Sequence, residues 1–343
     1  MRRIALLVLG ACLALLLAFP VLFSNPAVTT IGVFTLIFAG AATSWNIFSG
    51  YTGYISLGHA AFYGVGAYTI TLLCKIWQIP GGYVPFLLIP LAGLLAALLA
   101  IPLGWIALRI RLYSFVIMTI AFLFIMQLLA YNIPGITNGS NGIYLPAPPW
   151  SSDLYNMPFY YVALVVFLLV LGVSWWIRHS KYGLSLLAIR DDEDRAQSLG
   201  VNTRRHKLTA FVISAIFTGM AGAMMAYFVG IVSPPSAFDP SFDVTVALMT
   251  FMGGSGTLLG PVLGAFLLVP LQQYLTLQYG EIGLDLVLYG ALLLLVILLL
   301  PEGIVPTLRR RWSARRASHH IVPAPANQER TWLVEGKEKG VNV

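Results

Sequence analysis

Apolar runs of about 20 residues recur along this 343-residue chain. A run of this length can cross the hydrocarbon core of a bilayer, which is about 30 Å thick, whereas the eighth expected span, 241–254, is shorter than that. Hydrophobic residues make up 58% of the chain and charged residues only 10%, which leaves no room for a sizeable soluble domain. The sequence therefore predicts an all-α integral membrane protein, a polytopic helical bundle of about ten spans within a range of 8–10. The expected spans are 4–23, 28–48, 55–74, 84–108, 112–132, 159–177, 208–231, 241–254, 257–279 and 284–301.

The distribution of Lys and Arg predicts the orientation, because these residues gather in cytoplasmic loops. With a cytoplasmic N-terminus, every one of the 20 Lys and Arg residues except Lys75 lies inside, so 20 − 1 = 19 do. The chain then divides into a transmembrane domain, 1–308, with a charged cytoplasmic loop at 178–207, and a basic, disordered cytoplasmic tail, 309–343. Because the N-terminus and the tail would both be cytoplasmic, the chain must cross the membrane an even number of times. This favours ten spans. The tail is either a solvated anchor or a contact with anionic membrane lipid.

The sequence lacks the motifs that mark several classes of function. The sequence has no G-x-x-x-x-G-K-[ST] phosphate loop, no H-E-x-x-H, no G-x-S-x-G and no cysteine cluster, so we expect no catalytic residues, no metal site and no cofactor in this chain. The basic residues are scattered over several loops, which argues against nucleic-acid binding. Asp239, Asp243, Glu281 and Asp285 map near the outer ends of spans, so ion ligands at mid-membrane depth are few. These absences indicate a passage whose energy comes from another subunit.

Two glycine-rich stretches interrupt the apolar runs. In SLGHAAFYGVGAY, Ser56, Ala60 and Gly64 would form one stripe on a helix, flanked by Gly66. Such a stripe either packs helices closely or lines a substrate passage that unwinds locally. His59 is expected to be a hydrogen-bonded histidine near the inner end of its span, with a gate or ligand as the alternative. The second stretch, GGSGTLLGPVLGA, supplies four further candidates for the passage or for helix packing: Gly253, Gly254, Gly256 and Gly260.

The cytoplasmic loop KYGLSLLAIRDDEDRAQSLGVNTRRHK predicts a short helix at about 192–199. Asp191 and Asp192 are good N-terminal caps, and Gly200 is a natural C-terminal stop. This helix is either a solvated linker or a docking element for a cytoplasmic partner.

Three stretches together resemble the LivM-type permease of branched-chain amino acid ABC importers: SLGHAAFYGVGAYTITLL, AIRDDEDRAQSLGVNTRRHKLTAFVISAIFTGMAGAM and GGSGTLLGPVLGAFLL. The similarity covers most of residues 28–302, whereas the tail beyond about 310 does not match. The resemblance implies a transport subunit rather than an enzyme, located in the bacterial inner membrane. Its substrates would be branched-chain amino acids or, as for relatives in this family, urea, short amides or aromatic acids.

The resemblance also implies the partners. They are a homologous second permease subunit, two cytoplasmic ABC ATPase subunits that bind the ATP and Mg, and a periplasmic substrate-binding protein. The segment Ile189 to Gly200 would be the coupling helix seated in an ATPase groove. Its residues are Ile189, Arg190, Asp191, Asp192, Glu193, Arg195, Ala196, Leu199 and Gly200.

Two other classes of function stay open from the residues alone. An ion-coupled secondary transporter would carry its substrate without any ATPase partner. An integral-membrane enzyme would need a convergent catalytic set, and the sequence offers only the isolated His59, His179 and His206.

Overall fold

The computed structural model describes residues 2–23, 25–110, 112–151 and 155–279 and, beyond these, 290–291, 294, 303–308 and 310. The described residues up to Val305 belong to one compact unit in which helices dominate. The predicted span 284–301 lies almost entirely outside the described residues, as does nearly all of the predicted tail 309–343. The division of the chain into these two domains therefore stays a prediction.

The long helices are α1 (Arg2–Leu22), α2 (Pro26–Trp45), α3 (His59–Ile76), α5 (Ile89–Ala107), α6 (Leu112–Asn132), α8 (Asn156–His179), α11 (Thr203–Val229), α13 (Pro240–Gly253) and α14 (Gly260–Tyr279). Shorter elements join them: a π-helical turn that continues α2 (Asn46–Gly50), α4 (Val84–Leu87), α7 (Pro134–Thr137), a 3-10 turn (Gly139–Asn141), β1 (Ile143–Tyr144), α9 (Lys181–Asp191), α10 (Glu193–Ser198), β2 (Ile231–Val232) and α12 (Pro234–Ala237).

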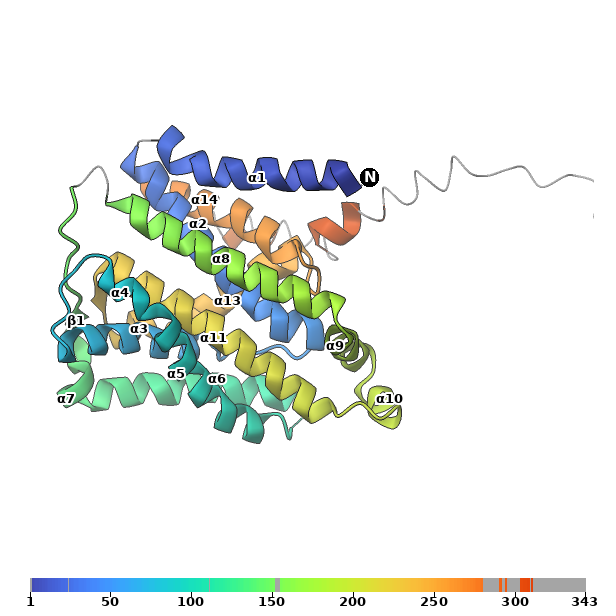
Figure 1. Ribbon diagram of the computed structural model, residues 1–343. Coiled ribbons are helices and arrows are strands. Elements are labelled where there is room, and N and C mark those ends of the chain that lie inside the picture. The colour runs from blue at the N-terminus through green and yellow to red at the C-terminus, as the bar shows by residue number, and fades with distance from the viewer. Residues whose placement is uncertain are drawn as a thin grey trace, which may run out of the picture. The chain divides into compact units, whose positions relative to one another are not determined.

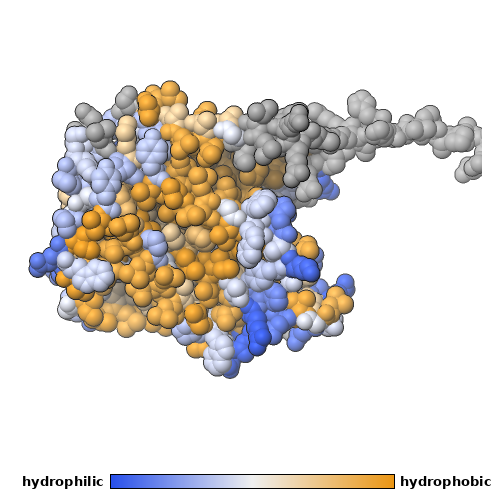
Figure 2. All heavy atoms as spheres, in the orientation of Figure 1, coloured by the Kyte–Doolittle hydropathy of each residue, from blue (hydrophilic) through white to orange (hydrophobic). Residues whose placement is uncertain are grey.

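Helix α11 packs against α3, α5 and α2 in the interior of the bundle (Figure 1). At one end of the bundle, β1 and β2 form an antiparallel pair in which Ile143 lies opposite Val232. Helices α9 and α10 lie at the opposite end. Figure 2 shows hydrophobic residues across the middle of the bundle and strongly hydrophilic residues around the end that carries α9 and α10. This is the surface expected of a bundle whose middle faces lipid.

By length and hydropathy, six helical segments of the described chain are able to cross a membrane: Pro26–Gly50, Val84–Ala107, Leu112–Asn132, Asn156–His179, Thr203–Val229 and Gly260–Gln278. The expected all-α membrane fold is confirmed, whereas these six do not establish the expected count of about ten. Helix α13 has 14 residues, as predicted for the short eighth span. At 1.5 Å per residue it is about 21 Å long, shorter than the hydrocarbon core.

The start of α3 differs from the prediction. Residues 53–58 are not helical, and α3 begins at His59. The expectation that Ser56 shares a helical stripe with Ala60 and Gly64 is therefore wrong. Gly53 has a φ of +76°, a backbone conformation that few residues other than glycine adopt, and it interrupts the helix at this point.

Glycines on α3 allow very close helix contacts. A Cβ atom at Gly66 would lie 1.9 Å from the carbonyl oxygen of Gly219 in α11. At Gly64 it would lie 2.3 Å from the ring of Phe238. Small residues at such contacts let helix backbones approach each other in a membrane, where dispersion replaces the missing hydrophobic drive.

Replacing Gly66 with Leu should destabilise the bundle, because the side chain would have to displace the α11 backbone. Overpacking typically costs about 1–3 kcal/mol. Gly172→Leu is the matched control, because nothing lies within 4 Å of a Cβ atom at Gly172 on α8. We expect a lower thermal unfolding midpoint and a lower yield of monodisperse detergent-purified protein for Gly66→Leu only. Equal midpoints for the two variants would show that the close α3–α11 contact is not needed.

Candidate functional site

The break before α3 is supported by side chains from elsewhere in the bundle. The indole Nε1 of Trp45 donates to the Ser56 carbonyl oxygen at 2.9 Å, and the Leu57 backbone N–H donates to Thr119 Oγ1 at 3.2 Å. The Ser56 N–H donates to Ser49 Oγ at 3.2 Å. Because Ser56 is fully buried, these bonds replace the water that its backbone would otherwise need. The break is thus a defined part of the structure.

The N-terminus of α3 is capped by Asp243 from α13. Both carboxylate oxygens of Asp243 accept from the Ala60 backbone N–H, at 3.1 and 3.2 Å. A carboxylate is favoured here because the first N–H groups of a helix carry partial positive charge. The sequence predicted Asp243 near the outer end of its span and His59 near the inner end of another, and the contact between Asp243 and Ala60 shows that these two placements are not both right. The contact itself could not be foreseen, since the two residues lie 183 positions apart.

His59 is fully buried at the first position of α3, and both ring nitrogens are hydrogen-bonded. Nδ1 lies 3.0 Å from Ser56 Oγ, and Nε2 lies 2.9 Å from Ser214 Oγ in α11. The expected hydrogen-bonded histidine is confirmed. His59 thus ties the break to α11.

The second glycine-rich stretch forms the connection between α13 and α14. Gly253 ends α13, Gly254 and Gly256 lie in the connection, and Gly260 begins α14. Asn46, in the π-helical turn after α2, holds this connection from both sides. Its Oδ1 accepts from the Gly256 N–H at 2.8 Å, and its Nδ2 donates to the Thr257 carbonyl oxygen at 2.9 Å.

Two arginines, one from α8 and one from α9, also bind the connection between α13 and α14. Arg178 donates to the Gly256 carbonyl oxygen. Arg190 Nη1 donates to the Gly50 carbonyl oxygen at 2.9 Å and lies 3.4 Å from that of Ser255. Cations are favoured at carbonyls left free by helix ends. Arg190 therefore links the charged loop to both the end of α2 and the α13–α14 connection.

The charged loop contains two helices rather than one. The predicted helix at about 192–199 is confirmed as α10, with Asp192 as its cap: Asp192 Oδ1 accepts from the Arg195 N–H at 3.0 Å. Ile189, Arg190 and Asp191 belong instead to α9, because Asp192 is extended, with φ −162° and ψ 109°. Gly200 follows α10 with a φ of +88°.

A buried ion pair anchors α10 to the bundle. Lys207 Nζ, at the start of α11, lies 2.5 Å from Glu193 Oε1, and its side chain is 3% exposed. The Tyr54 hydroxyl donates to Glu193 Oε2, and Lys207 Nζ lies 4.1 Å from the centre of the Tyr54 ring. Burial favours the protonated carboxyl, but the hydrogen bonds from Lys207 and Tyr54 and the charge of Lys207 outweigh it and hold the pKa of Glu193 below its usual value.

The two faces of α10 differ. Ala196 is buried, as is Ile189 on α9, so these two residues face the bundle. Arg195 and Gln197 are exposed, and the Leu199 side chain is 84% exposed. Among the predicted coupling residues, Leu199 is therefore the one apolar side chain available to a partner.

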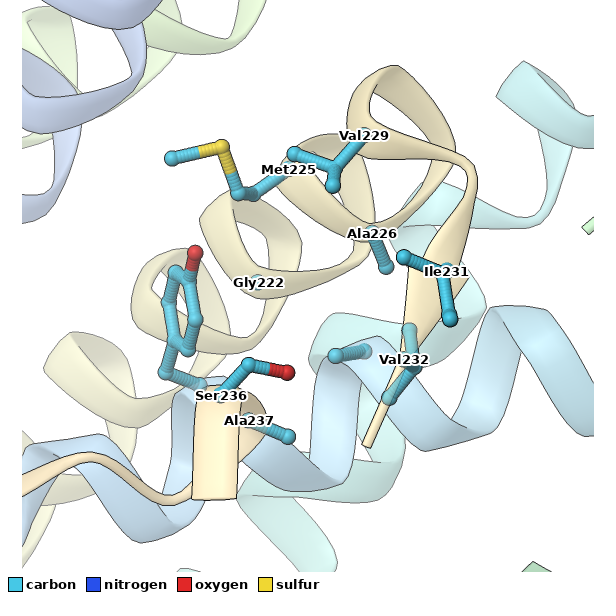
Figure 3. A pocket seen from close by; sticks show the side chains of 10 residues that line it. Gly222, Met225, Ala226, Val229, Ile231, Val232, Ser236 and Ala237 are labelled. Carbon is cyan, nitrogen blue, oxygen red and sulfur yellow. The ribbon is translucent and has the colours of Figure 1, made fainter. Parts of the chain in front are cut away.

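Two cavities adjoin near the other end of α11. Figure 3 shows the smaller one, of about 70 Å³, with Gly222, Met225 and Ala226 of α11 facing Ser236 and Ala237 of α12. A larger cavity, of about 350 Å³, shares lining residues with it and extends to α2, α13 and α14. Neither Ser56 nor His59 lines these cavities. Within the described residues, no three His, Cys, Asp or Glu side chains gather as a metal site.

Comparisons with known proteins agree with this architecture. Residues 27–297 match the family model described as a branched-chain amino acid transport system / permease component. The high-affinity branched-chain amino acid transport system permease protein LivM of Escherichia coli K12 is 32% identical over 329 residues, 88% of this chain and 75% of that protein. LivH of Salmonella typhimurium is 26% identical over 287 residues, 78% of this chain and 91% of that protein. No solved structure matches.

One more distant relative carries a different name. The autoinducer 2 import system permease protein LsrC of Yersinia pseudotuberculosis is 27% identical over 140 residues, which covers 38% of this chain and 40% of that protein.

Replacing Glu193 with Gln should loosen the loop between α10 and α11, because it leaves Lys207 buried without a counter-charge. Breaking a buried ion pair from one side costs about 3–5 kcal/mol, and partial exposure of Glu193 favours the lower end. We expect faster trypsin cleavage at Arg204 and Arg205. The control is Arg195→Gln, which removes an exposed ion pair with Asp192 worth at most about 1 kcal/mol. Equal cleavage rates in both variants would contradict the anchoring role.

The same anchor predicts a pH dependence. Because the folded-state pKa of Glu193 is lowered, the ion pair stabilises the fold above the ordinary glutamate pKa of about 4.3. That stability is lost as pH falls through the lower folded-state value. Pepsin cleavage of the loop should therefore rise below the ordinary value in the wild type and show no such step in Glu193→Gln.

Proposed function

This chain belongs to the family of branched-chain amino acid transport system permease components, and on that premise we propose that it is one membrane-spanning subunit of an ATP-driven importer. Its substrates are branched-chain amino acids or related small polar solutes. The names of LivM and LivH support this substrate class, and LsrC, with its different cargo, marks how far permeases of this kind diverge.

Four further subunits complete the proposed transporter: a homologous second permease, two cytoplasmic ABC ATPases and a periplasmic substrate-binding protein. The sequence has no phosphate loop of its own, which supports placing ATP and Mg in the ATPases. The chain itself then supplies the passage and the contact through which the ATPases act.

The proposed orientation places the end with α9 and α10 in the cytoplasm of a bacterium and both termini on the same side. It requires an even number of crossings, for which we keep ten. The distribution of Lys and Arg supports it, since 19 of the 20 then lie inside. The strongly hydrophilic end of the bundle in Figure 2 is the same end.

The α9–α10 loop is anchored to the bundle and exposes an apolar residue at its tip, and this supports the coupling proposal. Leu199 is 84% exposed and follows α10, whose own exposed side chains are charged or polar, and nothing within the described chain covers it. Behind it, Glu193 is held by Lys207 and Tyr54. An exposed apolar residue on a fixed support is the form that an interface anchor takes.

The anchors also define how movement at the loop reaches the passage. Tyr54 lies in the break before α3, so a displacement of α10 acts on the start of α3 through Glu193. Arg190 joins α9 to the end of α2 and to the α13–α14 connection. ATP-driven closure of the ATPases would thus move two helix breaks together, opening the bundle outward and then inward. This is alternating access by movement of packed elements around breaks.

Replacing Leu199 with Asp should abolish docking of the ATPases without unfolding the permease, because the side chain makes no buried contact. We expect normal membrane abundance but at least about tenfold less co-purified ATPase, the loss expected for one interface hot spot. Tyr144→Asp is the control. Tyr144 is 76% exposed at the opposite end of the bundle, so this variant should retain the ATPases.

A cytoplasmic ATPase is lost through Leu199 only if that end faces the cytoplasm, so the result also tests the orientation. Retention of the ATPases by Leu199→Asp would refute the docking site. Loss of the ATPases from Tyr144→Asp but not from Leu199→Asp would show that the bundle has the opposite orientation in the membrane.

A further inference from the structure

The larger cavity is lined by both apolar and polar side chains. Its volume of about 350 Å³ falls within the range of about 300–1,000 Å³ that is typical of small-molecule sites. Its apolar lining includes the side chains of Phe34, Phe38 and Phe242. Its polar lining includes the carboxylate of Asp239 and the amides of Gln272 and Gln273. It adjoins the smaller cavity of Figure 3, with which it shares Tyr63, Met225, Val229 and Ser236.

Polar groups in this cavity lack partners within the described chain. Tyr63 is 7% exposed, yet its hydroxyl makes no hydrogen bond with any described residue. The side chains of Thr245, Gln272 and Gln273 make none either. On the same helix as Thr245, Thr250 Oγ1 donates to the Val246 carbonyl oxygen at 2.9 Å. Tyr63 is buried and the other three residues are half-buried, so their polar groups are available to a polar ligand in the cavity.

The charge of the cavity limits which class of ligand it can bind. Asp239 is the one charged side chain among the described residues that line it. One of its oxygens, Oδ1, accepts from the Ser241 N–H at 2.8 Å, and Oδ2 takes part in no described hydrogen bond. Asp243, one turn further along α13, is committed to the N-terminus of α3. A carboxylate without a cationic neighbour disfavours an anion and favours an ammonium group.

We propose that this cavity is a weak binding site for an α-amino acid with an aliphatic side chain, with the ammonium group on Asp239. The substrate carboxylate accepts hydrogen bonds from the neutral donors of Tyr63, Gln272 and Gln273. The aliphatic side chain packs against the phenylalanine residues of the lining. The proposal rests on the proposed function and places its substrate within this one chain. Urea offers Asp239 no positively charged group and has no apolar side chain to pack against the phenylalanine residues.

The test is saturation-transfer NMR of L-leucine with the purified chain in nanodiscs. We expect signal on the leucine methyl groups, competed by L-isoleucine but not by 4-methylpentanoate, which lacks the ammonium group. Asp239→Asn should weaken binding by at least about tenfold, the effect of one charged hydrogen bond. Asp239 is the N-cap of α13, and Asn caps a helix equally well, so the variant should fold, which its thermal unfolding midpoint checks.

One further variant and one control complete the test. Thr245→Val removes one hydroxyl from the cavity and should weaken leucine binding less than Asp239→Asn does. Asp194→Asn removes a carboxylate from the opposite end of the bundle and should leave binding unchanged. Equal binding by the wild type and a folded Asp239→Asn, or competition by 4-methylpentanoate, would overturn the site. Absence of leucine binding in a chain that still supports ATP-driven leucine uptake would overturn the site alone, whereas absence of both would overturn the proposed function.

Discussion

Backbone N–H and C=O groups inside a bilayer must find partners within the protein, and the breaks in this bundle depend on that constraint. A helix satisfies its own backbone groups, but residues 53–58 and the connection after Gly253 do not. At the first break, the partners are Trp45, Thr119 and Asp243. At the second, Asn46 supplies both a donor and an acceptor. Both of these breaks therefore lie where distant side chains converge.

This arrangement connects the breaks to the charged loop at the end of the bundle. Arg190 on α9 donates to a carbonyl at the end of α2, and Tyr54 within the first break donates to Glu193 on α10. The Lys207–Glu193 pair then closes the link to α11, the helix that packs against α3, α5 and α2. In the proposed coupling, a movement applied to α10 would therefore reach both helix breaks, whose backbone groups are hydrogen-bonded by side chains of other elements.

Much of the fold could be predicted from the sequence, because its signals are local. The apolar runs predicted the long helices, and the spacing of Asp192 and Gly200 predicted α10 with its cap and its end. The two glycine-rich stretches marked both places where helices are interrupted. The start of α3 was placed too early, since the small residues from Ser56 onward fit a helical stripe equally well.

The connections between distant residues could not be predicted from one sequence. Asp243 caps α3 from 183 positions away, and Tyr54 meets Glu193 across 139 positions. No spacing rule reaches that far. Asn46 gave a usable signal, because an amide in an apolar run needs a buried partner. The cavity was missed because its lining comes from six helices, and the candidate glycines of α3 face α11 and Phe238 instead.

The central claim is that this permease has no energy source of its own and is driven through the α9–α10 loop. The most direct measurement is L-leucine uptake into proteoliposomes that contain the chain with its second permease subunit, with and without the ATPases and the binding protein. The account predicts accumulation only when the ATPases, the binding protein and ATP are all present. Accumulation driven by a proton or sodium gradient without any ATPase would contradict it.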